Sequence, residues 1–180
     1  MGTGEMAAGE IAARFNRAFG RAGAGTVLLG GAEEPLYLPA TARRPAIIRY
    51  TLDYAASALH ELAHWLVAGA ERRRQVDYGY WYAPPPRDAE AQRRFYQVEV
   101  GVQSLELLLA TVCGLAFRPS ADNPGRDDPQ GAAEFASAVE ARACERVQRG
   151  LSARPAAVLQ ALEPHWRLRL CDRFEVPAHG

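Results

Sequence analysis

The chain has 180 residues, which is long enough to bury a full hydrophobic core within one domain. Acidic and basic residues number 21 each, and this balance excludes the one-signed surface of proteins that bind nucleic acid or anionic membranes through their overall charge. All the basic residues are arginine, so a lysine nucleophile and a Schiff base are excluded as well. We predict a single domain over residues 1–180, with residues 1–8 flexible and the core over about 11–170.

The first third of the chain predicts one helix and three strands. Apolar residues at helical spacing predict a short helix over residues 11–19, which Gly20 closes. Residues 26–40, TVLLGGAEEPLYLPA, contain two β-prone runs with a Gly-rich connection, so we expect a hairpin or two neighbouring strands. A third strand is expected over residues 46–52.

A second helix is expected over residues 54–68, with Asp53 as its N-cap and Gly69 as its stop. Its apolar residues lie on nearly every side of the helix, which is typical of a helix buried in the interior. Polar side chains in such a helix need partners, because their burial without hydrogen bonds or a cation costs free energy.

The remainder of the chain predicts mostly helix. Residues 76–86, VDYGYWYAPPP, have the aromatic density of a strand that ends at three prolines. A long helix is expected over residues 88–112, a loop over 118–131, and further helices at about 131–149 and 155–169. The elements together predict an α+β fold, in which a small sheet packs on the buried second helix and further helices form the C-terminal half.

The cysteines and the N-terminus indicate the compartment. Cys113, Cys144 and Cys171 are odd in number and form no CxxC pair, which is typical of reduced cysteines rather than of a disulfide framework. The N-terminal segment lacks a basic leader followed by an apolar run, and no apolar stretch approaches the roughly 18 residues that span a bilayer. The sequence predicts a cytoplasmic protein without a membrane partner.

The segment ALHELAHWLVAG, within the second helix, carries the pattern His-Glu-x-x-His. Residues four apart on a helix lie on one face, so the imidazoles of His60 and His64 can bind one metal ion while Glu61 serves as a base or supports the ligands. The alternative is a pair of core histidines that hydrogen-bond to protein groups. We predict a metal site.

A third protein ligand must come from elsewhere in the chain. Glu99 is flanked by valines in the long helix, and a carboxylate in an apolar environment is costly unless a cation or hydrogen bonds compensate it. Glu106, seven residues later, is the second candidate. The alternative is a solvated helix face that carries both glutamates and Gln103.

Two histidines and a carboxylate fit two metals. With zinc the set resembles the hydrolytic site of zincin-like peptidases, in which Glu61 acts as the base for a bound water. With iron(II) the same ligands form a facial triad that leaves positions for dioxygen and substrate. The ligand types alone do not decide between the two.

The stretches LYLPA, ASALHELAHWLVAGAERRRQVDYGYWYAP, RDAEAQRRFYQVEV and SADN together resemble the elongation factor P hydroxylase family. The resemblance covers most of the chain, from about Phe15 to about Leu162. It implies an enzyme that hydroxylates the modified lysine of elongation factor P, a translation factor, and so completes its post-translational modification. It also implies a metal site with the ligands His60, His64 and Glu99.

The implied reaction uses dioxygen at iron(II), with zinc as the alternative metal. The sequence has neither the HxD pair of oxoglutarate-dependent oxygenases nor a flavin fingerprint. In such a reaction Glu61 would orient ligands or pass protons. We predict a zincin-like fold and a non-haem iron hydroxylase, with a zinc peptidase and a non-catalytic metal-stabilised binding module as alternatives.

A lysine-derived substrate is a long cation, so we expect carboxylates and aromatic faces at the entrance to the site. The predicted substrate-binding residues are Asp77, Tyr78, Tyr80, Trp81, Tyr82 and Asp88. The alternative is that the aromatic residues fill the core beside charged loop ends.

Overall fold

The first half of the chain builds a three-stranded sheet of β1 (Thr26–Ala32), β2 (Leu36–Leu38) and β3 (Ala46–Thr51). β1 runs parallel to β3 and β2 runs antiparallel along its other edge, so the strand order is β1-β3-β2. Alternate residues of β3 are buried, as expected of a strand with one face against the core. The structure is a computed structural model that describes residues 4–21, 25–79, 84–124 and 128–176.

The prediction that the two runs in residues 26–40 are neighbouring strands is wrong. β1 and β2 both exist, but each pairs with β3, which lies between them. β-Branched and aromatic residues give β3 the strongest β-propensity of the three strands. The register of β1 shifts between Leu29 and Ala32, where Gly31 has a φ of 84°, so β1 is distorted at the point from which a tight hairpin would have to start.

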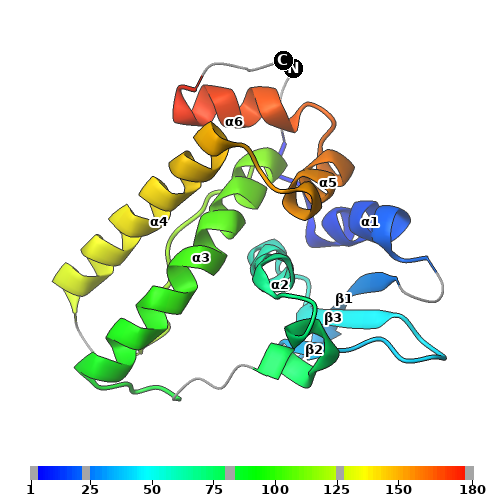
Figure 1. Ribbon diagram of the computed structural model, residues 1–180, viewed down its shortest axis with the longest axis horizontal. Coiled ribbons are helices and arrows are strands. Elements are labelled where there is room, and N and C mark those ends of the chain that lie inside the picture. The colour runs from blue at the N-terminus through cyan, green and yellow to red at the C-terminus, as the bar shows by residue number, and fades with distance from the viewer. Residues whose placement is uncertain (1–3, 22–24, 80–83, 125–127, 177–180) are drawn as a thin grey trace.

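Helices form the rest of the described chain. They are α1 (Ala8–Phe19), α2 (Ala55–Val67), α3 (Ala89–Cys113), α4 (Pro129–Arg149), α5 (Ala153–Leu162) and α6 (Trp166–Phe174), with the short 3-10 helices η1 (Arg72–Arg74) and η2 (Val76–Gly79). α2 lies at the centre, with the sheet on one side and α3 on the other (Figure 1). α1 packs on β1 and α2, and α4 packs along α3. The α+β class and the central place of the second helix are as predicted.

The central helix α2 is buried along most of its length, as its apolar sequence predicts. Its ends differ from the prediction, because the N-cap is Tyr54 rather than Asp53 and the C-cap is Ala68 rather than Gly69. The Arg154 guanidinium of α5 donates from Nη2 to the carbonyl oxygens of Leu66 (2.7 Å) and Ala68 (2.8 Å). A cation from another helix therefore satisfies the last carbonyls of α2, where a glycine turn was expected.

The strand predicted for residues 76–86 is wrong over its described first part. Val76–Gly79 form the 3-10 helix η2, in which Asp77 and Tyr78 have left-handed φ angles of 47° and 58°. A strand requires extended backbone, so these residues cannot continue a sheet. The three prolines were expected to end this strand, but residues 76–79, which precede them, are already not extended.

The helices of the second half were predicted with one error. α3 spans almost the predicted residues and begins after Asp88, whose Oδ1 accepts a hydrogen bond from the Ala91 backbone N–H at 2.8 Å. The helix predicted over residues 155–169 is instead two helices, α5 and α6. Pro164 lies at the break, because proline lacks a backbone N–H and disfavours helical backbone at the residue before it.

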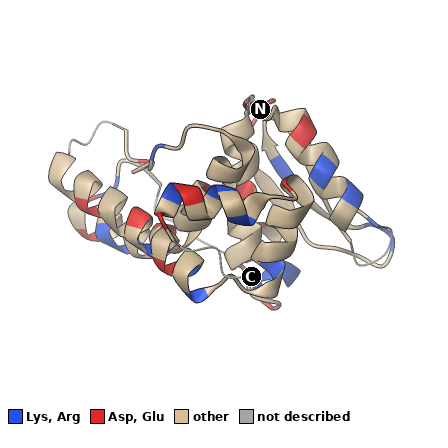
Figure 2. Ribbon diagram, turned by 90° about the horizontal axis from the view of Figure 1, so that it is seen from above, with Lys and Arg blue, Asp and Glu red and all other residues tan. Residues whose placement is uncertain are grey.

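Charge and cysteines agree with the sequence analysis. Both acidic and basic residues occur along the helices, and the two signs are mixed in the view of Figure 2. All three cysteines are free, and burial raises the pKa of the Cys113 thiol to about 12.

Among the described helices, none is both long enough and apolar enough to cross a membrane.

Candidate metal centre

His60 and His64 lie one helical turn apart on the face of α2 that meets α3. The Nε2 atom of His64 lies 3.0 Å from the Nε2 atom of His60, and the ring centroids are 4.7 Å apart. Two ring nitrogens that face each other at this distance converge on one small volume, as the four-residue spacing predicts.

Glu99 reaches the same volume from α3. Its Oε1 atom lies 3.7 Å from Nε2 of His64, and the residue is only 1% exposed. One ligand atom from each of His60, His64 and Glu99 lies within 4.8 Å of the others. The three residues therefore lie together as predicted, and the alternative of a solvated helix face is wrong for Glu99.

Glu106 lies two turns further along α3 and meets a different atom. Its Oε2 accepts a hydrogen bond from Nδ1 of His60 at 2.8 Å. A carboxylate in this position fixes the tautomer and the orientation of the imidazole, so that the other ring nitrogen, Nε2, is presented to the cluster. Both glutamates named from the sequence belong to the site, but only Glu99 belongs to the three-atom cluster.

The two histidines differ in proton affinity. Burial acts to lower the pKa of His60, but the hydrogen bond to Glu106 and the charges of Glu106, Glu99 and Glu61 together raise it to about 9. Burial and the positive charge of His60 lower the pKa of His64 to about 3. Two ring nitrogens 3.0 Å apart share one proton between them, and a bound cation would take the place of that proton.

Glu61 is also buried, at 8% exposure, although it does not join the three-atom cluster. Burial raises the pKa of its carboxyl group to about 7, with His60 opposing the shift and the charges of Asp77, Glu99 and Glu106 adding to it. A carboxyl group with a pKa near neutrality can both accept and donate a proton at physiological pH.

A cavity of about 440 Å³ opens over the cluster. Its described lining includes the five ionisable residues of α2 and α3 discussed above, the Phe95 ring, and Arg118, Ser120 and Asp122 from the loop after α3. We call residues 118–123 the wall segment. The wall segment has no helix or strand of its own, so side chains of other elements must hold it in place.

Gln103 is one residue of the site that the sequence analysis missed, as are Phe95 and Asp122 of the cavity lining. Gln103 was assigned to the alternative solvated face, but it is 1% exposed and hydrogen-bonds to Glu99 and to the backbone of Ser120. Its signal in the sequence is the four-residue spacing from Glu99, which places both side chains on one side of α3. That spacing alone could not reveal the loop residue with which Gln103 pairs.

Of the residues predicted to form the substrate entrance, the described ones, Asp77, Tyr78 and Asp88, are not among the described lining of the cavity. Asp77 accepts a hydrogen bond from the Tyr37 backbone N–H at 2.8 Å, and Asp88 caps α3. Tyr78 is 3% exposed, stacks on Tyr37 with ring centroids 4.1 Å apart, and lies 6.4 Å from the His64 ring. Tyr80, Trp81 and Tyr82 lie outside the described residues.

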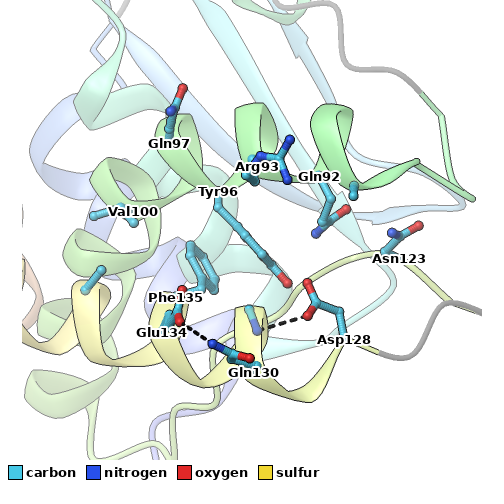
Figure 3. A pocket seen from close by; sticks show the side chains of 13 residues that line it. Gln92, Arg93, Tyr96, Gln97, Val100, Asn123, Asp128, Gln130, Glu134 and Phe135 are labelled. Atoms are coloured by element: carbon cyan, nitrogen blue, oxygen red, sulfur yellow. Dashed lines mark hydrogen bonds between the residues drawn. The ribbon is translucent and has the colours of Figure 1, made fainter.

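A second, larger groove of about 640 Å³ lies between α3 and α4, and Figure 3 shows its lining. Gln92 and Tyr96 of α3 border it, and the Tyr96 ring stacks on Phe135 of α4 with centroids 4.5 Å apart. Asn123, the last residue of the wall segment, also borders this groove. The wall segment therefore adjoins two cavities, which leaves it little packing support of its own.

The sequence model of a family described as elongation factor P hydroxylase matches residues 14–174. The elongation factor P lysine hydroxylase of Haemophilus influenzae is 42% identical over 158 residues, which are 85% of this chain and 85% of that protein. The matched range contains every residue of the cluster and the wall segment. The resemblance found in the sequence is confirmed, and the chain belongs to the elongation factor P hydroxylase family.

Proposed function

We propose that this protein hydroxylates the modified lysine of elongation factor P, with iron(II) held by His60, His64 and Glu99. The observation that carries the proposal is the meeting of these three side chains, from two helices, with ligand atoms within 4.8 Å of one another. The family and the named activity of the Haemophilus influenzae relative support the substrate and the reaction. The helix that carries His-Glu-x-x-His beside a small sheet also supports a zincin-like arrangement in a single domain, and we expect the enzyme to act in the cytoplasm, where translation occurs.

The donor atoms fit iron(II) as well as zinc. Two imidazoles and one carboxylate suit non-haem iron, which when bound would activate dioxygen for insertion of one oxygen atom into a C–H bond. The protein contributes orientation, since Glu106 holds the His60 ring with Nε2 towards the cluster. It contributes a proton-exchanging group in Glu61. The apolar residues of α2 around the histidines keep bulk water away from the reacting atoms.

The cavity suits the end of a lysine-derived side chain. Glu61 offers a carboxyl group, Phe95 an aromatic surface, and Asp122 a half-exposed carboxylate near the mouth. Within the described residues we assign contact with the substrate cation to these three, and positioning roles to Asp77, Tyr78 and Asp88. Contact between the substrate and Tyr80, Trp81 or Tyr82 stays a prediction from the sequence.

The activity is tested by incubating the iron-loaded protein with elongation factor P that carries the modified but unhydroxylated lysine, in air and with ascorbate as reductant. Intact-mass analysis is expected to find a gain of one oxygen atom, located on the modified lysine by fragmentation. The gain should be absent without dioxygen. Cleavage of elongation factor P would instead support a peptidase, and an unchanged mass in air would contradict the hydroxylase.

Exchange of Glu61 for glutamine separates the two enzyme classes. In a zinc peptidase Glu61 would be the base that activates water, so Glu61→Gln would remove nearly all turnover while the metal stays bound. In the hydroxylase its role is proton exchange and orientation, so we expect Glu61→Gln to bind metal fully and to retain measurable hydroxylation, reduced by about 10²-fold at most. Metal content and single-turnover hydroxylation measure the two properties. A folded, fully metallated variant without any activity would contradict this role.

A further inference from the structure

Gln103 joins two parts of the site that come from different regions of the chain. Its Nε2 donates hydrogen bonds to Oε2 of Glu99 at 3.2 Å and to the carbonyl oxygen of Ser120 at 2.9 Å. Its Oε1 accepts a hydrogen bond from the Ser120 backbone N–H at 2.9 Å. Glu99 belongs to the metal cluster and Ser120 to the wall segment, so one buried amide contacts both.

The amide of Gln103 has one favourable orientation. If its oxygen and nitrogen were exchanged, Oε1 would face the Glu99 carboxylate and the Ser120 carbonyl oxygen, and both contacts would be repulsive. With the nitrogen towards these two acceptors, every contact is attractive. The side chain is 1% exposed, so water does not readily replace these bonds. The position of Glu99 and the position of Ser120 are therefore linked through a rigid group.

The wall segment depends on such side chains, because it has no ladder or helix hydrogen bonds. Besides Gln103, the Gln92 side chain donates from Nε2 to the Ala121 carbonyl oxygen at 2.7 Å, and the Arg87 guanidinium pairs with the Asp122 carboxylate at 2.9 Å. Gln92 lies on α3 as Gln103 does and is 3% exposed, but it borders the groove between α3 and α4 (Figure 3). The two glutamines thus hold adjacent residues of the wall segment, and Gln103 also bonds to Glu99.

We propose that Gln103 is a positioning residue that couples metal binding at Glu99 to the order of the wall segment. A cation held by Glu99 restricts its carboxylate, the restricted carboxylate holds the Gln103 amide, and the amide holds Ser120 in the cavity wall. Loading of the metal therefore completes the substrate cavity, and by linkage an ordered wall segment strengthens metal binding. The proposal rests on the metal site of the proposed function and adds to it the residue that connects the metal to the substrate cavity.

The matched variants are Gln103→Met and Gln92→Met. Methionine has nearly the length and volume of glutamine but no amide, so each change removes hydrogen bonds without opening a large cavity. Ser120 is exposed, and water can bond to its backbone when the amide is absent. Gln103→Asn serves as a second variant, because it keeps an amide that is too short to reach both Glu99 and Ser120.

The experiment uses Co²⁺ as the probe, with its visible absorption as the measure of affinity and coordination, and amide hydrogen exchange of residues 118–123 as the measure of wall order. In the unmodified protein, Co²⁺ is expected to slow this exchange at least about fivefold, the lower end of ordinary coupling between sites. Gln103→Met is expected to bind Co²⁺ about 10- to 100-fold more weakly, to change the Co²⁺ spectrum, and to lose the slowing at saturating metal. In Gln92→Met the amides of the wall segment are expected to exchange faster both with and without Co²⁺. This variant should keep the Co²⁺ affinity within about twofold, and Co²⁺ should still slow the exchange.

Four results would contradict the proposed coupling between Glu99 and the wall segment. Unchanged Co²⁺ affinity and undiminished slowing in Gln103→Met would overturn the coupling, and so would an equal loss of affinity in Gln92→Met. Should Gln103→Met fail to fold, Gln103→Asn is expected to give the same loss of slowing by metal, and retention of it there would overturn the coupling. Absence of Co²⁺ binding in the unmodified protein would overturn the metal site itself and the coupling with it.

Discussion

His64→Ala is expected to abolish stoichiometric metal binding and all hydroxylation while the protein stays folded. In the proposed site His64 supplies one of three ligand atoms that lie within 4.8 Å of one another, so its loss leaves one imidazole and one carboxylate. The affinity should fall by more than the roughly 100-fold that the loss of an outer hydrogen-bond partner costs. His60→Ala should behave in the same way, and it would also leave the Glu106 carboxylate without the His60 Nδ1 donor.

Metal analysis of the purified variants and Co²⁺ titration measure this effect, and circular dichroism checks the fold. The matched control is His165→Ala, because His165 is an exposed histidine next to α6 and remote in sequence from the cluster. The control should keep one metal per chain and full activity. A full metal complement in His64→Ala or His60→Ala would mean that the cluster is not the metal site.

The second large effect is expected from replacing the carboxylates of Glu99 and Glu106, and the structure predicts that the two replacements differ in their effect on metal binding. Glu99→Gln should remove metal binding and activity, because a neutral amide replaces the carboxylate oxygen that lies 3.7 Å from Nε2 of His64. Glu106→Gln should still bind metal, but about 10- to 100-fold more weakly, because it loses the charge that orients the His60 ring. Activity of Glu106→Gln should recover at saturating metal.

Co²⁺ titration of the two variants decides between these roles, with activity measured at saturating metal as a second observable. Glutamine is nearly isosteric with glutamate, so neither change should disturb the packing of α3. If Glu106→Gln lost its metal and Glu99→Gln kept it, the ligand and the orienting group would be reversed. Equal complete loss in both would mean that the charge balance of the site, rather than a single ligand, holds the metal.

The proximity of His60 and His64 could be predicted from the sequence because it is set locally. His60 and His64 lie on one helix, where a four-residue spacing fixes their proximity whatever the tertiary structure. Glu99 could be named because a carboxylate between valines is costly without compensation. The family resemblance then implied that Glu99 shares one metal site with His60 and His64. The helix boundaries of α1, α3 and α4 were also close to the prediction, since periodicity and capping residues determine them locally.

Three of the errors concern features that depend on contacts between distant residues. The sheet order requires β3 to lie between two strands that precede it, and no spacing within residues 26–40 indicates that. The last carbonyls of α2 are satisfied by Arg154, 86 and 88 residues away from the two groups it bonds. Gln103 looked like a surface residue because the loop backbone that buries it comes later in the chain. In each case a tertiary contact decided the outcome over a local preference.

The strand order has a consequence for the folding pathway. In the described part of the chain β1 and β2 each pair only with β3, so neither strand has a sheet partner until residues 46–51 are available. A nascent chain that ends before β3 can form α1, but it exposes two unpaired strands. The parallel β1–β3 ladder closes over twenty residues of sequence, from Thr26 to Ala46, which makes its formation slower than that of a hairpin. Until β3 is synthesised, the unpaired edges of β1 and β2 are therefore prone to aggregation. Once β3 is available, the three strands can form the sheet on which α2 packs.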